Sequence, residues 1–473
     1  MNESSKVGLA VLVAALLLGL LGDWLLRAAV PGLNVFLWVS CLLGAFWWVT
    51  RRYRVPLAGE GRWLLLLIPL LAVGFLWRDS AVLQALDAIA LLLLFALSAL
   101  TTRAGQLRTA EITQYLFGSF YSGLQTLFSP FSLLLRDIEW KSLPRGRWGK
   151  TVGAVLAGIL IALPLLLVFG VLFISADPLF ERLVNNLFRF TPDTLVAHVV
   201  MTAFFAWLAA GFFRTALVGP DKALPTLNRP TALALGITES SVVLGLLNLL
   251  FLAFVLVQFR YLFGGTAAVL ADNGLTYADY ARRGFFELVA VAALVLPVLL
   301  TGHWLIAKEN PGNERLFRWL SLSLIALLAV IMASAFQRMY LYLEAYGLTE
   351  LRFYSTVFMG WLAVLFAWFT LTVLRGARNR FAFGVLVSGL AVLFVLHAVN
   401  PDGLIARTNI ARLADGRQLD QSYIASLSAD AVPVLANALP QMPGLEDRRE
   451  SLERLDWRSW NWGRRQALAA LKR

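Results

Sequence analysis

The sequence predicts an all-α fold, a polytopic transmembrane helical bundle with a small helical C-terminal tail on the extracytoplasmic side. The chain has 473 residues, of which 59% are hydrophobic and only 15% are charged, and its mean hydropathy is +0.71. Soluble domains are about 45–50% apolar and about 25% charged. The excess apolar residues fall in blocks of roughly twenty, long enough for a helix to cross a hydrocarbon core about 30 Å thick.

About eleven such blocks qualify as membrane spans. The N-terminal segment, 1–103, contains four of them, and the main membrane bundle, 151–400, contains about seven. No small-residue cleavage site follows the first block, so we expect it to remain as a membrane anchor. The expected spans are 7–27, 31–50, 63–78, 80–102, 152–174, 194–217, 238–262, 285–307, 316–340, 352–374 and 381–400.

The lysines and arginines between the spans predict the orientation. With the N-terminus in the cytoplasm, the inner segments contain 21 basic residues and the outer loops contain 9, and the tail after residue 400 contains the remaining 11 of 41. Cytoplasmic loops are enriched in lysine and arginine, so this count favours a cytoplasmic N-terminus and an extracytoplasmic tail. The net charge of +12 needs no nucleic acid partner, because basic residues on the inner face meet the anionic headgroups of the lipid bilayer.

The basic cytoplasmic loop, 104–150, contains a predicted amphipathic helix at 112–135. No charge interrupts this stretch, so a further membrane span is the alternative. Pro130 and the many serine, threonine and glutamine side chains favour a helix that lies in the cytoplasmic interface with its aromatic face toward the lipid. Its apolar residues recur at three- and four-residue steps, and they are Ile112, Leu116, Phe120, Leu124, Leu127 and Phe131.

The tail, 401–473, contains no apolar block, and we expect a soluble helical unit. Asp420 is placed to cap one short helix, and Ser428 or Asp430 to cap the next. The last segment clusters three tryptophans, which either pack the tail against the bundle or lie at the headgroup level. The tail is also where a protein partner would bind. The tryptophans are Trp457, Trp460 and Trp462.

Five strings in the second half of the chain resemble a known family. They are "RYLFGG" (260–265), "GLTYADYARRGFFEL" (274–288), "YGLTELRFYS" (346–355), "NPDGLIARTNIAR" (400–412) and "SLSADAVPVL" (426–435). They are similar to a bacterial family of polytopic membrane proteins whose defining region is named only as a domain of unknown function, number four-one-seven-three. The strings cover roughly 240–440. The resemblance implies a bacterial inner-membrane protein with a multi-span bundle and an extracytoplasmic helical tail, and it supplies no catalytic residue.

Polar residues gather at the extracytoplasmic ends of the later spans, above all in "AFQRMYLYLEAYGLTELRFYS" (335–355). Gly347 is expected to end one helix and Thr349 to cap the next. Ionisable groups at membrane depth usually face an interior or a watery cavity, and arginines with tyrosines suit an anionic ligand. The candidate ligand-binding residues are Arg260, Tyr280, Arg282, Arg283, Glu287, Arg338, Tyr342, Glu344, Glu350 and Arg352.

The same residues also allow a structural interpretation, in which tyrosines mark the interfacial belt and Arg–Glu pairs fix helix ends. His198, His303 and His397 belong near different membrane faces, and Cys41 is the only cysteine, so we expect no metal site. The sequence contains no phosphate-cradling glycine loop and no zinc-protease or serine-hydrolase motif. We therefore expect no cofactor, and the catalytic residues, if the chain has any, are unknown.

These observations predict an integral protein of the bacterial inner membrane that binds or transports a small anionic or lipid-like ligand through an extracytoplasmic Arg/Tyr/Glu pocket. A membrane enzyme acting on a lipid-linked substrate, with Glu287 or Glu344 as its base, is a less favoured alternative. A membrane scaffold or sensing partner of a signalling system is another.

Overall fold

The computed structural model describes residues 3–103, 105–140, 169–170, 172–173, 175–180, 192–219, 236–263, 285–305 and 311–472. Every regular element in these ranges is a helix. Ten helical segments within them are long and apolar enough to cross a membrane. The predicted all-α polytopic bundle is therefore confirmed. The remaining expected span, 152–174, falls almost entirely outside the described ranges.

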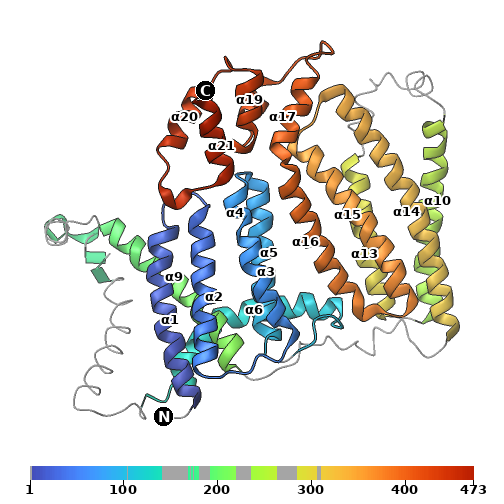
Figure 1. Ribbon diagram of the computed structural model, residues 1–473. Coiled ribbons are helices and arrows are strands. Elements are labelled where there is room, and N and C mark those ends of the chain that lie inside the picture. The colour runs from blue at the N-terminus through green and yellow to red at the C-terminus, as the bar shows by residue number, and fades with distance from the viewer. Residues whose placement is uncertain are drawn as a thin grey trace.

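The first four spans lie side by side beneath the tail (Figure 1). Their ends agree with the apolar blocks to within a few residues, because the blocks are bounded by charged or glycine-containing turns. The third span is the shortest and consists of a 3₁₀ turn and two α-helical pieces. The helices are α1 Glu3–Leu26, α2 Leu33–Arg52, η1 Glu60–Trp63, α3 Leu64–Ala72, α4 Gly74–Trp77 and α5 Ala81–Thr101.

A helix lies across the end of this group that is remote from the tail (Figure 1). It is α6, Ile112–Ser132, and a π-helical turn, η2 Leu133–Asp137, continues it. Phe120 on α6 is 67% exposed, whereas Ser122 and Ser129 are buried against the bundle. This outward apolar face is the one expected of a helix in the membrane interface. Behind α1 runs α9, Pro192–Phe213, with its π-helical end η4, Arg214–Val218.

The second half of the bundle comprises five long helices within the described ranges from residue 236 to residue 400. Most of its buried apolar side chains form one cluster, and most of those of the N-terminal helices form another, which also includes Ala382 and Leu386 of α16. Leu83 on α5 meets Leu393 and Leu396 on α16 where the two halves join. The elements are α10 Ile237–Phe263, α13 Phe285–Leu305, α14 Pro311–Tyr346, α15 Glu350–Thr372, η6 Val373–Arg375, η7 Arg378–Arg380 and α16 Phe381–Val399.

The tail is a compact cap of short helices on the end of the bundle opposite the N-terminus (Figure 1). Asp420 and Ser428 cap helices as the sequence predicts. Trp457 packs on Trp24 of α1, with ring centroids 5.7 Å apart, so at least one of the three tryptophans contacts the bundle. The helices are α17 Pro401–Ala411, α18 Gln421–Ser426, η8 Ala429–Ala431, α19 Val432–Ala438, α20 Leu445–Glu453, η9 Trp457–Ser459 and α21 Trp462–Leu471.

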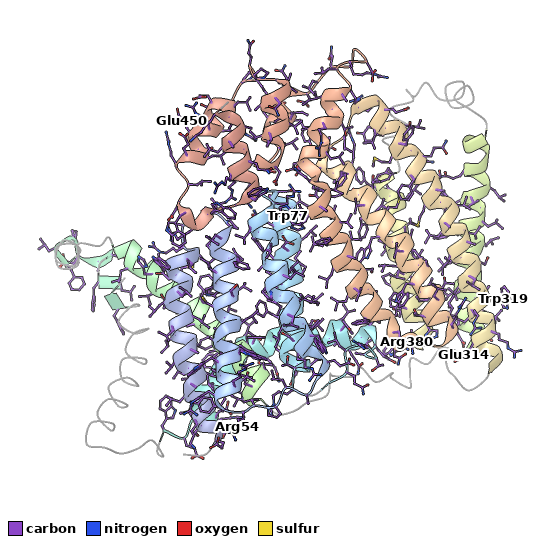
Figure 2. All side chains as sticks on the ribbon, in the orientation of Figure 1. Arg54, Trp77, Glu314, Trp319, Arg380 and Glu450 are labelled. Atoms are coloured by element: carbon purple, nitrogen blue, oxygen red, sulfur yellow. The ribbon has the colours of Figure 1, made fainter. Side chains whose placement is uncertain are left out.

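Four charged side chains illustrate the two ends of the molecule, on either side of the spans. Figure 2 shows Arg54, Glu314 and Arg380 at the end remote from the tail, and Glu450 on the tail. Trp319 lies on the outer side of α14 and is 70% exposed. Apolar side chains that face outward between two charged ends are what a lipid environment requires. The protein is a multi-pass membrane protein, and which end is cytoplasmic stays a prediction.

Candidate functional site

Six of the ten predicted ligand-binding residues have described side chains. Arg260 lies on α10, but its side chain falls outside the described part of the chain, and Tyr280, Arg282 and Arg283 lie outside it altogether. The six others come from the tail-side ends of α13, α14 and α15. They are Glu287, Arg338, Tyr342, Glu344, Glu350 and Arg352.

The turn between α14 and α15 holds Arg352 against Tyr342. Gly347 ends α14 with a left-handed backbone (φ +79°), and Thr349 caps α15, as the sequence predicts. The Arg352 guanidinium donates to the carbonyl oxygen of Gly347 over 2.6 Å and lies 4.0 Å from the centroid of the Tyr342 ring. Arg352 thus satisfies carbonyls that a helix end leaves without partners, in agreement with the structural interpretation of this residue.

The tail covers the same turn. Arg412, directly after α17, donates to the carbonyl oxygen of Glu344 over 2.8 Å. The hydroxyl oxygen of Tyr423 on α18 accepts from the backbone amide of Glu350 over 2.7 Å. The side chain of Glu344 is exposed and that of Glu350 is half-buried. These two glutamates therefore mark the place where the tail rests on the α14–α15 hairpin.

Glu287 and Arg338 line a cavity of about 470 Å³ between α10, α13 and α14. Gln258 is the third polar residue in its wall, and its side-chain oxygen accepts from the Ser334 hydroxyl over 2.5 Å. All three polar residues lie toward the tail-side ends of their helices. The rest of the wall is apolar and consists of Leu250, Phe251, Phe254, Val257, Leu288, Val291 and Ile331. We call this space the α10–α13–α14 cavity.

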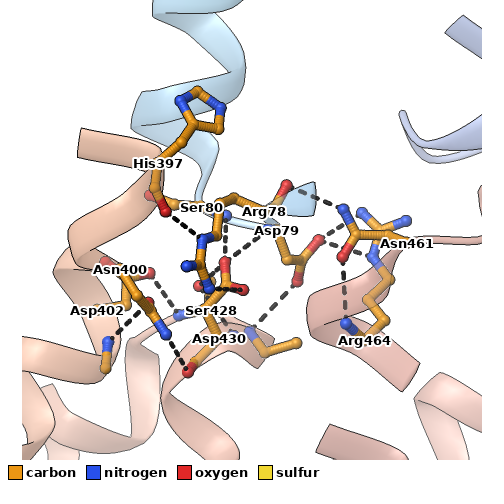
Figure 3. Close-up of polar contacts among 12 residues, drawn as sticks. Arg78, Asp79, Ser80, His397, Asn400, Asp402, Ser428, Asp430, Asn461 and Arg464 are labelled. Atoms are coloured by element: carbon orange, nitrogen blue, oxygen red, sulfur yellow. Dashed lines mark hydrogen bonds and ion pairs between the residues drawn. The ribbon is translucent and has the colours of Figure 1, made fainter. Parts of the chain in front are cut away.

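A second polar site, which was not predictable from the sequence, joins the short α4–α5 turn to the tail (Figure 3). The Asp430 carboxylate accepts from the amides of Asp79 (2.6 Å) and Ser80 (3.1 Å), and its other oxygen lies 3.8 Å from Nη1 of Arg78. Asp79 in turn pairs with Arg464 of α21, with Nε and Oδ1 2.6 Å apart. The charges are paired across the two segments, which is the condition for tolerating buried charge.

Asn461 completes this contact. Its Nδ2 donates to the carbonyl oxygens of Phe75 (2.8 Å) and Arg78 (2.9 Å), at the end of α4, where helix carbonyls need outside partners. Its Oδ1 accepts from the Arg464 amide over 3.1 Å and so caps α21. The residue is 1% exposed. We call the five residues that carry these contacts the tail clasp: Arg78, Asp79, Asp430, Asn461 and Arg464.

Burial dominates the electrostatics of the tail clasp. It raises the pKa of Asp430 to about 6, and the nearby carboxylates of Asp79 and Asp402 act in the same direction. The hydrogen bond from the Asp79 amide and the charge of Arg78 oppose this rise. Burial likewise raises the pKa of Asp402 and lowers the pKa of Arg78. The clasp therefore contains a carboxyl group that changes its charge near neutral pH.

Next to the tail clasp, an Asp–His pair is buried between two membrane spans. Nε2 of His397 on α16 lies 3.1 Å from Oδ2 of Asp87 on α5, and the side chains are 5% and 0% exposed. The backbone carbonyl oxygen of His397 accepts from Nε of Arg78 over 2.7 Å. The pair thus adjoins the clasp through one arginine.

The other two histidines lie elsewhere. His198 on α9 contacts Asp23 on α1 (Nδ1–Oδ2, 2.5 Å), and His303 on α13 packs on Phe317, with ring centroids 5.6 Å apart. Across the described ranges, no three histidine, cysteine, aspartate or glutamate side chains are grouped so that they could hold a metal ion.

Comparison of the chain with known protein families gives one match. The model of a family described as "Domain of unknown function (DUF4153)" matches residues 65–438, most of the chain. The chain belongs to this family. The family number expected from the sequence strings was wrong, and the matched region is longer than the expected 240–440. Comparisons with curated proteins and with solved structures find no match.

The match in the DUF4153 family includes most of the tail clasp, but its last two residues, Asn461 and Arg464, lie beyond the matched region. One local signal could have pointed to the clasp. The string "WRDSA" (77–81) places an arginine, an aspartate and a serine in the tight connection between two spans, where such residues need partners. No local pattern names those partners, since Asp430 lies about 350 residues further along the chain.

Proposed function

We propose that the protein binds a lipid-like amphiphile in the α10–α13–α14 cavity, with the polar headgroup between Glu287 and Arg338. We place this site in the bacterial inner membrane, on the extracytoplasmic side. The single observation that carries the proposal is the distribution of polarity in the cavity wall, where three polar residues lie at one end and the rest of the wall is apolar.

The apolar part of the wall suits an acyl chain and not a free small anion. On α10, Gln258 and Leu250 are separated by about two helical turns, or roughly 12 Å along the axis. Phe254 and Val257 lie between them and are 40% and 60% exposed on the side of the helix that faces outward. A ligand can therefore enter sideways from the bilayer. Its apolar chain then contacts apolar side chains, which predominate in the walls of ligand pockets.

The charged end suits a headgroup that carries both signs of charge. The half-buried guanidinium of Arg338 is the natural partner of a phosphate, which it can bind through two parallel N–H donors. The exposed carboxylate of Glu287 suits an ammonium group. A zwitterionic phospholipid with a primary amine, such as phosphatidylethanolamine, offers both groups, and phosphatidylglycerol offers only the phosphate.

Binding can be measured by native mass spectrometry of the purified chain with added phosphatidylethanolamine or phosphatidylglycerol. We expect Arg338→Gln to weaken the binding of both lipids by roughly tenfold, the scale of a charge-assisted hydrogen bond. Glu287→Gln should weaken only phosphatidylethanolamine, by roughly two- to fivefold, as for an exposed ion pair.

Neighbouring positions on α10 provide a matched control for this experiment. Val257 lines the cavity and Leu256 does not, although they are 60% and 63% exposed. Val257→Trp should fill the headgroup end and abolish lipid retention, and Leu256→Trp should leave it unchanged. Equal lipid retention by both tryptophan variants would refute the proposed site.

A further inference from the structure

The buried Asp87–His397 pair has hydrogen-bond geometry that fixes its proton content. Nδ1 of His397 lies 2.9 Å from the carbonyl oxygen of Leu393, one helical turn earlier on α16. A carbonyl oxygen only accepts hydrogen bonds, so Nδ1 carries a proton. A neutral imidazole has a single N–H, and in that form Nε2 is a bare acceptor facing Asp87 Oδ2 across 3.1 Å.

An ionised Asp87 beside this neutral imidazole would place two lone pairs against each other in a buried site. A proton between Nε2 and Oδ2 removes the conflict. It can reside on Nε2, which gives an imidazolium–carboxylate pair, or on Oδ2, which gives a neutral imidazole and a carboxylic acid. Both forms contain the same number of protons and have no net charge, which is what a site with almost no solvent exposure requires.

We propose that Asp87 and His397 form a proton-binding site between α5 and α16, which holds one proton per chain between Nε2 and Oδ2. Release of that proton leaves one uncompensated negative charge in the pair and makes the facing atoms repel each other. This site lies where the two halves of the bundle join, apart from the lipid cavity, and the proposal does not depend on the proposed function.

The surroundings of the pair connect this proton to the tail. Gly74 on α4 packs so closely that a Cβ at this position would clash with Asp87 and lie 2.7 Å from His397 Nε2. Arg78, which follows α4, is a further charged group that acts on the pair. It donates to the His397 carbonyl oxygen and faces Asp430. Movement of the last turn of α16 on proton release would therefore disturb the tail clasp.

The charges that face Asp430 belong to the same contact. Arg78 and Asp79 come from the α4–α5 turn, and Asp402 comes from α17. Arg464 of α21 neutralises Asp79. The Arg78 guanidinium thus contacts both the His397 carbonyl oxygen and Asp430, and it joins α16 to the tail. A change in the charge of the Asp87–His397 pair or of Asp430 therefore acts on this one group.

The chain contains a matched control for the pair. Asp23 and His198 form a second Asp–His contact, but His198 is 38% exposed and Arg27 also pairs with Asp23, at 3.1 Å. Here a guanidinium pairs with the carboxylate and the imidazole is exposed, so the contact does not require a shared proton. The two pairs therefore contain the same chemical groups, but only His198 is exposed and only Asp23 has an arginine partner.

The test is nitrogen-15 and proton NMR of the full-length chain with labelled histidine, in a His198→Gln, His303→Gln background that leaves only His397. We expect at neutral pH a protonated Nδ1 and a low-field signal from a proton shared between Nε2 and the carboxyl group, in slow exchange with deuterated solvent. A histidine with its proton on Nε2 alone and no low-field signal would overturn the proposal. This measurement needs no substitution in the pair.

Two variants extend the test. Asp87→Asn retains a side chain that can donate to Nε2 but removes the acid, so the low-field signal should vanish while Nδ1 stays protonated. In a chain that retains His198, Asp23→Asn should leave the low-field signal of His397 unchanged. Persistence of that signal in Asp87→Asn would assign the proton to another group and would equally overturn the proposal.

Discussion

The strongest test of the tail clasp is the substitution Asn461→Ala. It removes two hydrogen bonds to the carbonyl oxygens of Phe75 and Arg78 and the cap of α21. Loss of an N-cap costs about 1 kcal/mol, and each buried carbonyl left without its donor costs roughly 1 kcal/mol. The Arg78 carbonyl oxygen also accepts a hydrogen bond from Gln84, so the loss of its Asn461 donor costs no more than about 1 kcal/mol. The free energy of tail docking should therefore weaken by about 3 kcal/mol, which corresponds to a roughly hundredfold rise in the population of the released tail.

The released population can be measured as the labelling rate of a buried thiol. In a Cys41→Ser chain, Ser459→Cys places the thiol at a position that is 3% exposed and contacts the α1–α2 turn. When closing is fast, the rate of labelling follows the open fraction. Asn437→Ala, at an exposed asparagine on α19 of the same tail, is the control and should leave the rate unchanged. Equal labelling rates for the Asn461→Ala and Asn437→Ala variants would refute the reasoning.

Three further predictions follow from the contacts described above. Gly74→Ala should lower the thermal midpoint, because overpacking a tight contact of this kind costs about 1–3 kcal/mol; an unchanged midpoint in a thermal-shift assay would contradict it. Gly347→Ala should lower the thermal midpoint of the protein more than Gly376→Ala does. Both residues have positive φ, at +79° and +85°, but only at Gly347 does an added Cβ meet neighbouring side chains. Equal thermal midpoints for the two variants would contradict this prediction. Tail docking should strengthen with falling pH, since the docked Asp430, with its pKa of about 6, binds a proton at a pH where the released one, with a pKa near 3.8, does not. The labelling rate of the thiol, divided by that of an exposed thiol at the same pH because only the thiolate reacts, should be roughly tenfold lower at pH 5 than at pH 7. Asp430→Asn should reduce that dependence.

The sequence was sufficient for the spans because each apolar block is nearly the length of the helix that it forms. The largest difference is α14, which extends from Pro311 to Tyr346 instead of over 316–340. The hydropathy falls at Arg338, but the helix continues until the left-handed Gly347 ends it. Spacing along one helix was also sufficient for local contacts: Tyr342 and Tyr346, four residues apart, are in edge-to-face contact with ring centroids 5.2 Å apart.

Contacts between distant segments were not predictable in the same way. Arg352 was expected in a ligand pocket with Arg338, yet its guanidinium is engaged by the carbonyl oxygens of Tyr346 and Gly347. An arginine at a helix end can bind either a carbonyl or a ligand, and its residue type does not distinguish them. Asp87 and His397 are 310 residues apart, and neither lies in a motif. Only the packing of α5 on α16 brings them together.

The measurement that most directly tests the lipid-binding account is photocrosslinking in native membranes. A photoreactive phenylalanine analogue is placed either at Phe254, which lines the α10–α13–α14 cavity, or at Leu252 on the same helix, which does not. The two positions are 40% and 43% exposed, so bulk lipid reaches both equally. The account predicts capture of an amine-bearing phospholipid preferentially at Phe254, with the preference lost in Arg338→Gln. Capture of the same mixture of lipids at both positions, unaffected by Arg338→Gln, would contradict it.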